Sequence, residues 1–334
     1  MNTKIMYADI NYKNKIIKFI KDNWSSDHIL IKNEELFDYM YVDNSSINFV
    51  VSVNENIELQ AILGYVKYSN NDYCDIFLSL WRSLDSSKIE GLKCFEFLIN
   101  QNYNSISCVG INPKTFNYYK FFNFKIGKMV NYYIINPNFK KPSHLHILNI
   151  KTLPKHKKKE QTGYNLIELF EEHEIINTYK SVLHYSGNIK KSVRFFSKKY
   201  LHNPFRNYLF YKSKNLSGKT DLLIVMRIFH NENNSCLRIV DIIGSLDLIS
   251  QCGYAFQKIL ISSSHEYLDC LIGGVNKSIF SAAGFNKAGD KSNVYIPEYF
   301  EPFIDKKTSI FYSTNCNQHY TIFKGDGDQD RPNL

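Results

Sequence analysis

The order of the predicted secondary-structure elements repeats along the chain, and this repeat constrains the fold more than any single motif does. In the first half a strand, a helix, a strand and a short helix follow one another at residues 75–84, 91–102, 105–111 and 114–123. In the second half a helix, a strand and a short helix occupy residues 246–262, 267–273 and 276–283. Each copy ends in a turn before a phenylalanine, Phe124 or Phe285, and a final strand over 127–135 is predicted after the first copy. Apolar periodicity defines the elements, and their repetition predicts two similar α/β units in tandem.

A meander of three antiparallel strands is predicted before the second copy. Its strand-like runs are separated by polar turns containing Asn, Ser and Gly, and they occupy residues 207–212, 222–230 and 236–243. A basic, aromatic segment that includes His202 precedes the meander, and Asp241 lies near the end of its last strand, before Gly244. A carboxylate at a strand end can contact a ligand, but it is also common at an ordinary strand terminus. The sequence leaves both interpretations of Asp241 open.

Residues 137–163 interrupt the apolar patterns. The stretch contains three prolines, many polar residues and a run of lysines. Such a composition is typical of a connection between domains. We therefore predict an N-terminal domain over 1–140, a linker over 141–163 and a C-terminal domain over 164–334, which begins with a helix over 165–179.

The net charge indicates which classes of ligand to expect, and the cysteines indicate the compartment. The net charge of +9 is moderate for 334 residues, and no nucleic-acid-binding module is recognisable, so the charge favours small anions such as nucleotides and coenzymes. The seven cysteines form no CxxC pair and no metal-ligand spacing, which indicates a reducing compartment and no metal. The N-terminus lacks the apolar core of a signal peptide, and no run approaches the roughly 18 apolar residues of a membrane span. We expect a cytoplasmic protein.

Two segments of the first half carry a resemblance to a known fold. They are the strand–loop–helix at 81–93 and the stretch at 112–124 with its Tyr and Phe residues. With the order of the elements, they resemble the GNAT acyltransferases, in which a loop and a helix N-terminus bind the pyrophosphate of coenzyme A. The resemblance implies an α/β (α+β) fold of two tandem GNAT-like domains, each a mixed, largely antiparallel sheet flanked by helices.

The coenzyme contacts implied by the resemblance lie in the N-terminal half. They are Ile89, Gly91, Leu92 and Lys93. The family loop carries two glycines where this chain has only Gly91, and Lys93 would equally fit a solvated lysine in the first turn of a helix.

Five further motifs, spread over nearly the whole chain, narrow the resemblance. Two more short motifs, at 225–227 and 267–269, accompany the five at residues 24–37, 200–204, 240–244, 293–303 and 323–333. In this order they resemble the tandem GNAT-like N-acyltransferases of surface-polysaccharide gene clusters, a group that includes the N-acyltransferase of anthrose biosynthesis. The implied reaction moves an acyl group from acyl-CoA, with acetyl-CoA as the expected donor, to the amine of a nucleotide-linked amino sugar. The coenzyme A thioester would bind the N-terminal half and the nucleotide sugar would bind near the C-terminal half. A homo-oligomer is left open, and fold transfers within such a group better than substrate does.

The implied chemistry asks for a base and for groups that hold the reactants. Direct attack needs a neutral amine, donors for the developing oxyanion and reactants held in line; a simple alkylamine has a reference pKa of about 10.4. His202 is the first candidate for the base, with Asp241 orienting it, although a histidine hydrogen-bonded at a loop–strand junction fits the sequence equally well. His28 is a second candidate, and solvent could take the proton without any side-chain base.

Charged residues of the chain are candidates for substrate contacts. Arg227 lies inside an apolar strand, where it pairs either with a carboxylate of the fold or with a phosphate of the ligand. Asp328 and Asp330 alternate in a polar stretch that lacks the glycine and glutamate of a calcium-binding loop. The full set of predicted substrate contacts is His28, Arg227, Asp269, Asp328, Asp330 and Arg331.

Two rival functions fit the same sequence. One is acyl or aminoacyl transfer to another amine. The other is a scaffold derived from this fold that has lost turnover, which the single glycine at Gly91 leaves open.

Overall fold

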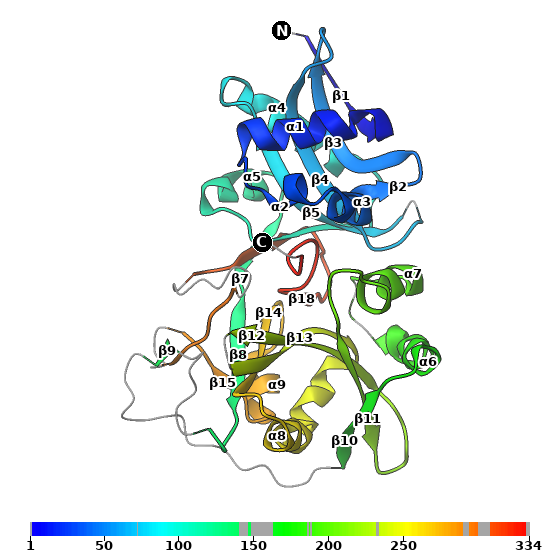
Figure 1. Cartoon of the computed structure of the whole chain (residues 1–334), viewed down its shortest axis with the longest axis vertical. Helices are drawn as coiled ribbons and strands as arrows, with labels where there is room; N and C mark the ends of the chain where they lie inside the picture. The colour runs from blue at the N-terminus through cyan, green and yellow to red at the C-terminus, as the bar shows by residue number, and fades with distance from the viewer. Residues whose placement is uncertain are drawn as a thin grey trace.

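The computed structural model describes residues 2–71, 73–139, 146–147, 163–185, 187, 189–231, 234–289, 294–299 and 308–331. In this part of the chain two eight-stranded sheets, each flanked by helices, follow one another along the long axis of the molecule (Figure 1). The predicted α/β class with two mixed sheets is confirmed. Most of the predicted linker, 141–163, lies outside the described residues.

The first sheet carries helices on both faces. Its strands, in spatial order, are β1 (Thr3–Asp9), β3 (Ser46–Asn54), β4 (Leu59–Lys67), β5 (Asp75–Ser83), β6 (Ser105–Val109), β17 (Phe311–Thr314) and β7 (Lys125–Lys128), with β2 (Val42–Asp43) beside β3. Alternate side chains point to opposite faces, so Val51 packs under α1 (Lys13–Asn23), α2 (Ile29–Lys32) and α3 (Glu34–Tyr41), whereas Val50 packs under α4 (Lys88–Ile99) and α5 (Phe116–Phe121). Within the described part of this sheet, β5 and β6 are the parallel neighbours.

The second sheet repeats this plan. Its strands are β10 (Tyr164–Leu169), β11 (Leu209–Asn215), β12 (Leu222–Asn231), β13 (Asn234–Gly244), β14 (Tyr267–Gly273), β8 (Val130–Ile135) and β15 (Asn286–Lys287), with β18 (Ile322–Phe323) on β14. One face packs against α8 (Gly253–Ser262) and α9 (Lys277–Ala282), and the other packs against α6 (Glu172–Val182) and α7 (Val193–Phe196). Here β13 and β14 are the parallel pair. Outside both sheets, β9 (His146–Ile147) pairs with β16 (Val294–Tyr295).

The short helix in each half begins and ends in the same way. The side chains of Asn112 and Asn276 accept hydrogen bonds from the backbone two residues on, as N-caps do. Beyond the helices, Asn123 and Gly284 adopt left-handed conformations with φ of 61° and 89°, which end a helix by satisfying its last carbonyls. The repeat inferred from the sequence therefore extends to the capping residues.

The two halves exchange strands. Residues 127–135 were expected to form one strand, but the chain leaves the first sheet after β7 and enters the second as β8, beside β14. In return β17 enters the first sheet between β6 and β7. Each predicted range, 1–140 and 164–334, thus supplies a strand to the other range's sheet. The expected helix over 165–179 was also wrong in its first half, because 164–169 pairs with β11 as β10.

The ring of Tyr312 in β17 packs closely against a glycine from each of the two sheets. A Cβ added at Gly127 of β7 or at Gly273 of β14 would lie 2.3 Å from its ring. We expect Gly273→Ala to lower the free energy of unfolding by about 1–3 kcal/mol, because overpacking a buried contact costs this much. Urea unfolding checks this, with Gly163→Ala as control, where the added Cβ would lie 3.5 Å from Leu216. Equal stability of the two variants would contradict it.

Candidate active site

A bulge opens the first sheet between its two parallel strands. The parallel register of β5 and β6 ends at Leu78 and Cys108. In the ladder of β5 with β4, Leu78 and Trp81 oppose residues only two apart, so Ser79 and Leu80 form a bulge. A bulge bends its strand, and β6 itself ends at Val109, after which Gly110 turns away with a φ of 83°. The strands therefore diverge from Ser79 onward.

The resulting cleft has a volume of about 620 Å³. Backbone and side chains of β5, of the turn after β6 and of the loop after α1 line it, and so do three residues near the end of the chain, Asp328, Gln329 and Arg331. The edge of β5 facing the cleft has no strand partner beyond Leu78 among the described residues. An extended amide-containing ligand can pair with such an edge as an added strand would.

The corresponding opening in the second sheet is filled. The β13–β14 register ends at Ile239 and Cys270, and the β12–β13 ladder shifts at the next position, as in the first half. Here, however, β18 pairs with Ile272 and Gly273, and the backbone N–H of Lys324 donates to the Leu271 carbonyl. Because residues 322–331, which we call the closing segment, occupy this gap, the open cleft is the one in the first half.

Helix α4 begins just beyond the cleft end of β5, after the 3₁₀ turn Asp85–Ser87. Gly91 is buried there and its carbonyl accepts a hydrogen bond of 2.9 Å from Trp81 Nε1. Lys93 pairs with buried Glu90 at 2.7 Å, whereas Ile89 is exposed and Leu92 is half-buried. The structure thus places all four predicted coenzyme contacts on the first turns of α4, and their part in coenzyme binding stays a prediction.

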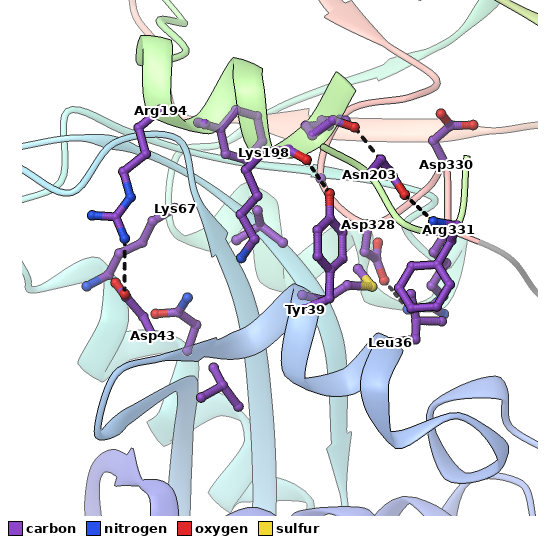
Figure 2. Close-up of a pocket in the computed structure, with 18 of the residues that line it drawn as sticks. Leu36, Tyr39, Asp43, Lys67, Arg194, Lys198, Asn203, Asp328, Asp330 and Arg331 are labelled. Carbon is purple, nitrogen blue, oxygen red and sulfur yellow. Dashed lines mark hydrogen bonds and ion pairs between the residues drawn. The ribbon is translucent and has the colours of Figure 1, made fainter. Parts of the chain in front are cut away.

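A second cavity, of about 120 Å³, lies on the other side of the closing segment (Figure 2). Its walls come from α3 and the adjacent strands of the first sheet, from α7 and the turn that follows it, and from the closing segment. Asp328 and Arg331 line both this cavity and the 620 Å³ cleft. The two spaces therefore approach each other at one ion pair, formed by Arg331 Nη1 and the Asp328 carboxylate.

Two buried hydroxyls lie beside this ion pair. Ser79 Oγ belongs to the cleft wall, and Tyr41 interacts electrostatically with both Asp328 and Arg331. Tyr41 lies close enough to interact with Ser79 and with Arg331, but neither hydroxyl completes a hydrogen bond of acceptable geometry among the described residues. Burial raises the pKa of Tyr41, so its hydroxyl keeps its proton and remains a donor. Unpartnered buried hydroxyls are uncommon and are frequent where a ligand supplies the missing partner.

Asp241 lies in a buried ion cluster. Its carboxylate accepts hydrogen bonds from Lys191 Nζ at 2.6 Å and Tyr200 Oη at 2.8 Å. Lys191 also pairs with Asp326 of the closing segment at 2.9 Å, and Asp326 accepts from Tyr68 Oη of the first half. The cluster therefore joins both halves to the closing segment, and the catalytic role of Asp241 stays a prediction.

His202 is elsewhere. Its side chain is 58% exposed and Nε2 lies 3.2 Å from Glu172. The structure does not bring His202 and Asp241 together, so we base the chemistry proposed below on other residues. His202 follows a π-helical turn, Ser197–Leu201, which the sequence patterns did not indicate and which directs the ring to the surface.

The other predicted contacts are in ion pairs. Arg227 pairs with Asp330 at 2.8 Å, so the carboxylate alternative considered for Arg227 is the one observed. Asp269, fully buried, accepts two hydrogen bonds from Arg238, at 2.8 and 2.6 Å. In the closing segment, burial and the nearby Arg238 lower the pKa of Lys324 to about 8. No sequence signal pointed to Tyr41, Ser79 or Lys191; the alternating carboxylates near the chain end did point to the closing segment.

His28 provides a test of this arrangement. Its Nδ1 accepts from the Leu30 N–H as the N-cap of α2, and its Nε2 lies 3.5 Å from Arg331. Burial, reinforced by Arg331, lowers the pKa of His28 to about 4. The unfolded chain, with an ordinary pKa near 6.5, then binds the proton first as pH falls, so the stability contributed by neutral His28 is complete above about pH 6.5 and is lost between pH 6.5 and 4.

We therefore expect His28→Asn, which keeps a capping side chain, to lose less stability than the wild type between pH 7 and pH 4.5. Urea unfolding at several pH values measures the difference, and all other titrating groups are common to both proteins. Parallel pH profiles would show that His28 is not held neutral by its neighbours.

Comparison with known proteins finds the fold but no close relative. The sequence matches no protein-family model and no curated protein. A protein of unknown function from Enterococcus faecalis V583, described as a probable N-acyltransferase, is similar with a TM-score of 0.57 at 9% identity, over 94% of this chain and 72% of that one. A GCN5-related N-acetyltransferase from Anabaena variabilis ATCC 29413 has the same TM-score and coverage at 10% identity. At this identity the likeness establishes the GNAT-like fold, as the sequence resemblance implied.

Two further features of the described residues bear on partners. None of their helices has the length and apolar character needed to cross a membrane. Among the same residues, no three His, Cys, Asp or Glu side chains come together in a way that could hold a metal ion.

Proposed function

We propose that the protein is an acyl-CoA-dependent N-acyltransferase whose acceptor is a nucleotide-linked amino sugar. One observation carries the proposal: an open cleft along the unpaired edge of β5 and a separate cavity on the opposite side share the Asp328–Arg331 pair. A reaction between two bound substrates needs two such sites with one meeting point. The similarity to solved N-acyltransferase folds supports the acyl-CoA part of the proposal.

The first-half cleft suits an acyl-CoA. The extended arm of the acyl-CoA contains two amides, which can pair with the unpaired edge of β5 from Ser79 to Ser83. At the end of this edge the N-terminus of α4 presents unpaired amides, which favour an anionic group such as the pyrophosphate. The equivalent gap of the second sheet is closed by β18, so we assign the coenzyme to the first half.

Asp328 is the residue we assign to the amine. When nitrogen attacks the thioester carbonyl, the C–N bond forms, the C–S bond breaks and the nitrogen loses a proton. The Asp328 carboxylate can hold the amine by a hydrogen bond and accept this proton as the forming bond acidifies the nitrogen. Arg331 fixes the orientation of the Asp328 carboxylate.

We assign the hydroxyls of Tyr41 and Ser79 to the thioester, the reactant that the amine attacks. Both are donors that complete no hydrogen bond of acceptable geometry in the described residues, and both lie beside Asp328 at the start of the divergence between β5 and β6. Donors fixed before the reaction stabilise the charge that develops on the carbonyl oxygen, or on the departing sulfur, without reorganisation. Direct attack of the amine on a thioester held in this way needs no covalent enzyme intermediate.

Release of free thiol tests the proposal. The protein is incubated with acetyl-CoA and longer acyl-CoAs together with dTDP-, UDP- and GDP-linked amino sugars, and thiol is measured with a chromogenic disulfide. We expect release that depends on both substrates and an acylated sugar of the corresponding mass. Release with aminoacyl or peptidyl amines alone would replace the sugar by another acceptor. Absence of both release and coenzyme A binding in calorimetry would overturn the enzyme proposal.

A further inference from the structure

Three cationic side chains gather at one end of the second cavity. Lys67 of β4, Arg194 of α7 and Lys198 of the following turn all line it, and Figure 2 shows them on one side of the space with Asp328 and Arg331 on the other. The nearest carboxylate, Asp43, approaches Arg194 only to 4.0 Å. Lys67 and Lys198 form no ion pair with any described carboxylate.

The other charges around this cavity are compensated. Asp328 pairs with Arg331, Asp330 pairs with Arg227, and Lys199 interacts with the Asp326 carboxylate of the ion cluster. The excess positive charge is therefore confined to the end formed by Lys67, Arg194 and Lys198. A concentration of like charge in a cavity raises its potential and attracts an anion.

The position of Lys198 is fixed by packing. Tyr39 Oη donates to the Lys198 carbonyl at 2.6 Å, and Lys198 Nζ lies 5.0 Å from the centre of the Tyr39 ring. The Tyr39 ring contacts Phe205 edge to face, with centroids 5.7 Å apart. The cations thus border an aromatic wall on which a planar ring could stack. Burial also lowers the pKa of Lys198, despite the opposing influence of Asp43.

We propose that Lys67, Arg194 and Lys198 bind a phosphate group of the acceptor, so that the acceptor's amine extends toward Asp328 at the other end of the cavity. Arg194 offers a planar donor pair suited to phosphate oxygens, and the lysines add point charges. This inference rests on the proposed function, because the acceptor is taken to be the amine-bearing substrate. It specifies that the acceptor is a phosphorylated one, with a nucleoside diphosphate as the group that also uses the aromatic wall.

The phosphates of coenzyme A are the other source of the same chemistry, and the experiment separates the two. Binding of UDP, dTDP, inorganic diphosphate and coenzyme A is measured by calorimetry on the full-length wild type, on the double variant Arg194→Ala/Lys198→Ala and on Lys277→Ala. Lys277 is an exposed lysine of α9 in the second half, and its substitution controls for the loss of one positive charge away from the cavity. We expect the double variant to bind the nucleoside diphosphate about 10- to 100-fold more weakly, with coenzyme A affinity unchanged.

A second variant is expected to strengthen nucleoside diphosphate binding instead of weakening it. Asp43 competes with the ligand for Arg194, so Asp43→Ala is expected to tighten nucleoside diphosphate binding severalfold. Unchanged nucleoside diphosphate affinity in the double variant, an equal loss for coenzyme A, or no binding of any diphosphate to the wild type would each overturn the inference. If the wild type binds a nucleoside diphosphate but no coenzyme A, the proposed function fails while the phosphate site stands.

Discussion

Asp326→Ala is expected to lower the free energy of unfolding by about 3–5 kcal/mol, because it leaves buried charges without compensation. Lys191 and Lys199 are the two ammonium groups in the cluster, and Asp241 and Asp326 are the two carboxylates. All four side chains are at most 9% exposed. Removing one carboxylate leaves a net positive charge where water cannot solvate it. Urea unfolding of the wild type and the variant measures the loss.

Two controls show whether charge balance is the cause. Asp247→Ala removes an exposed carboxylate from the same half and should change stability by less than about 0.5 kcal/mol. Lys191→Met added to Asp326→Ala restores neutrality with one lysine and Asp241 left, and should recover part of the loss in a double-mutant cycle. If Asp326→Ala lowered the free energy of unfolding by less than about 1 kcal/mol, or if the two substitutions were additive, the ion cluster would not be what holds the two halves together.

The same cluster predicts acid sensitivity. Burial opposes ionisation of Asp326, but Lys191 and Lys199 outweigh it and lower the pKa of the carboxyl below its usual value. The unfolded chain therefore binds a proton before the folded one does. The stability contributed by Asp326 is complete above the ordinary carboxyl pKa near 4 and is lost as pH falls through the lower pKa of the folded state.

The order of elements was predictable because it depends on local patterns. Apolar periodicity located β5, α4, β6 and α5, and Asn112 and Asn276 are caps that depend on only a few neighbouring residues. A strand pattern does not specify its partner, however. The run at 127–135 therefore gave no indication that the chain changes sheets at Met129, whose N–H donates to the Ile310 carbonyl.

The roles of the charged residues were less predictable for the same reason. The position of Asp241 near a strand end was right, but Lys191, its partner, lies 50 residues earlier in a stretch without regular structure. The π-helical turn before His202 decides the direction of that side chain. The bulge at Ser79 and Leu80, which opens the cleft, depends on the neighbouring strand β4. Each of these depends on residues distant in sequence.

Asp328→Asn is expected to reduce kcat for amine acylation by about 100- to 10,000-fold, the range over which a positioned acid or base contributes. The asparagine keeps the size of the side chain and an acceptor for Arg331, but it cannot accept the amine's proton. Steady-state thiol release, with the amine substrate found by the thiol-release experiment, gives kcat and KM, and calorimetry gives coenzyme A affinity. We expect kcat to fall while coenzyme A affinity changes little.

Asp330→Asn is the matched control, two residues away in the same closing segment. Asp330 lines the second cavity, pairs with Arg227 and accepts a hydrogen bond from Tyr208, but it does not line the first-half cleft. Its substitution should lower thermal stability or raise the KM of the acceptor and leave kcat within a few-fold of the wild type. If Asp328→Asn kept kcat within threefold while Asp330→Asn lost it, the Asp330 carboxylate, and not that of Asp328, would accept the proton. The meeting point of the two substrates would then lie there, and not at the Asp328–Arg331 pair.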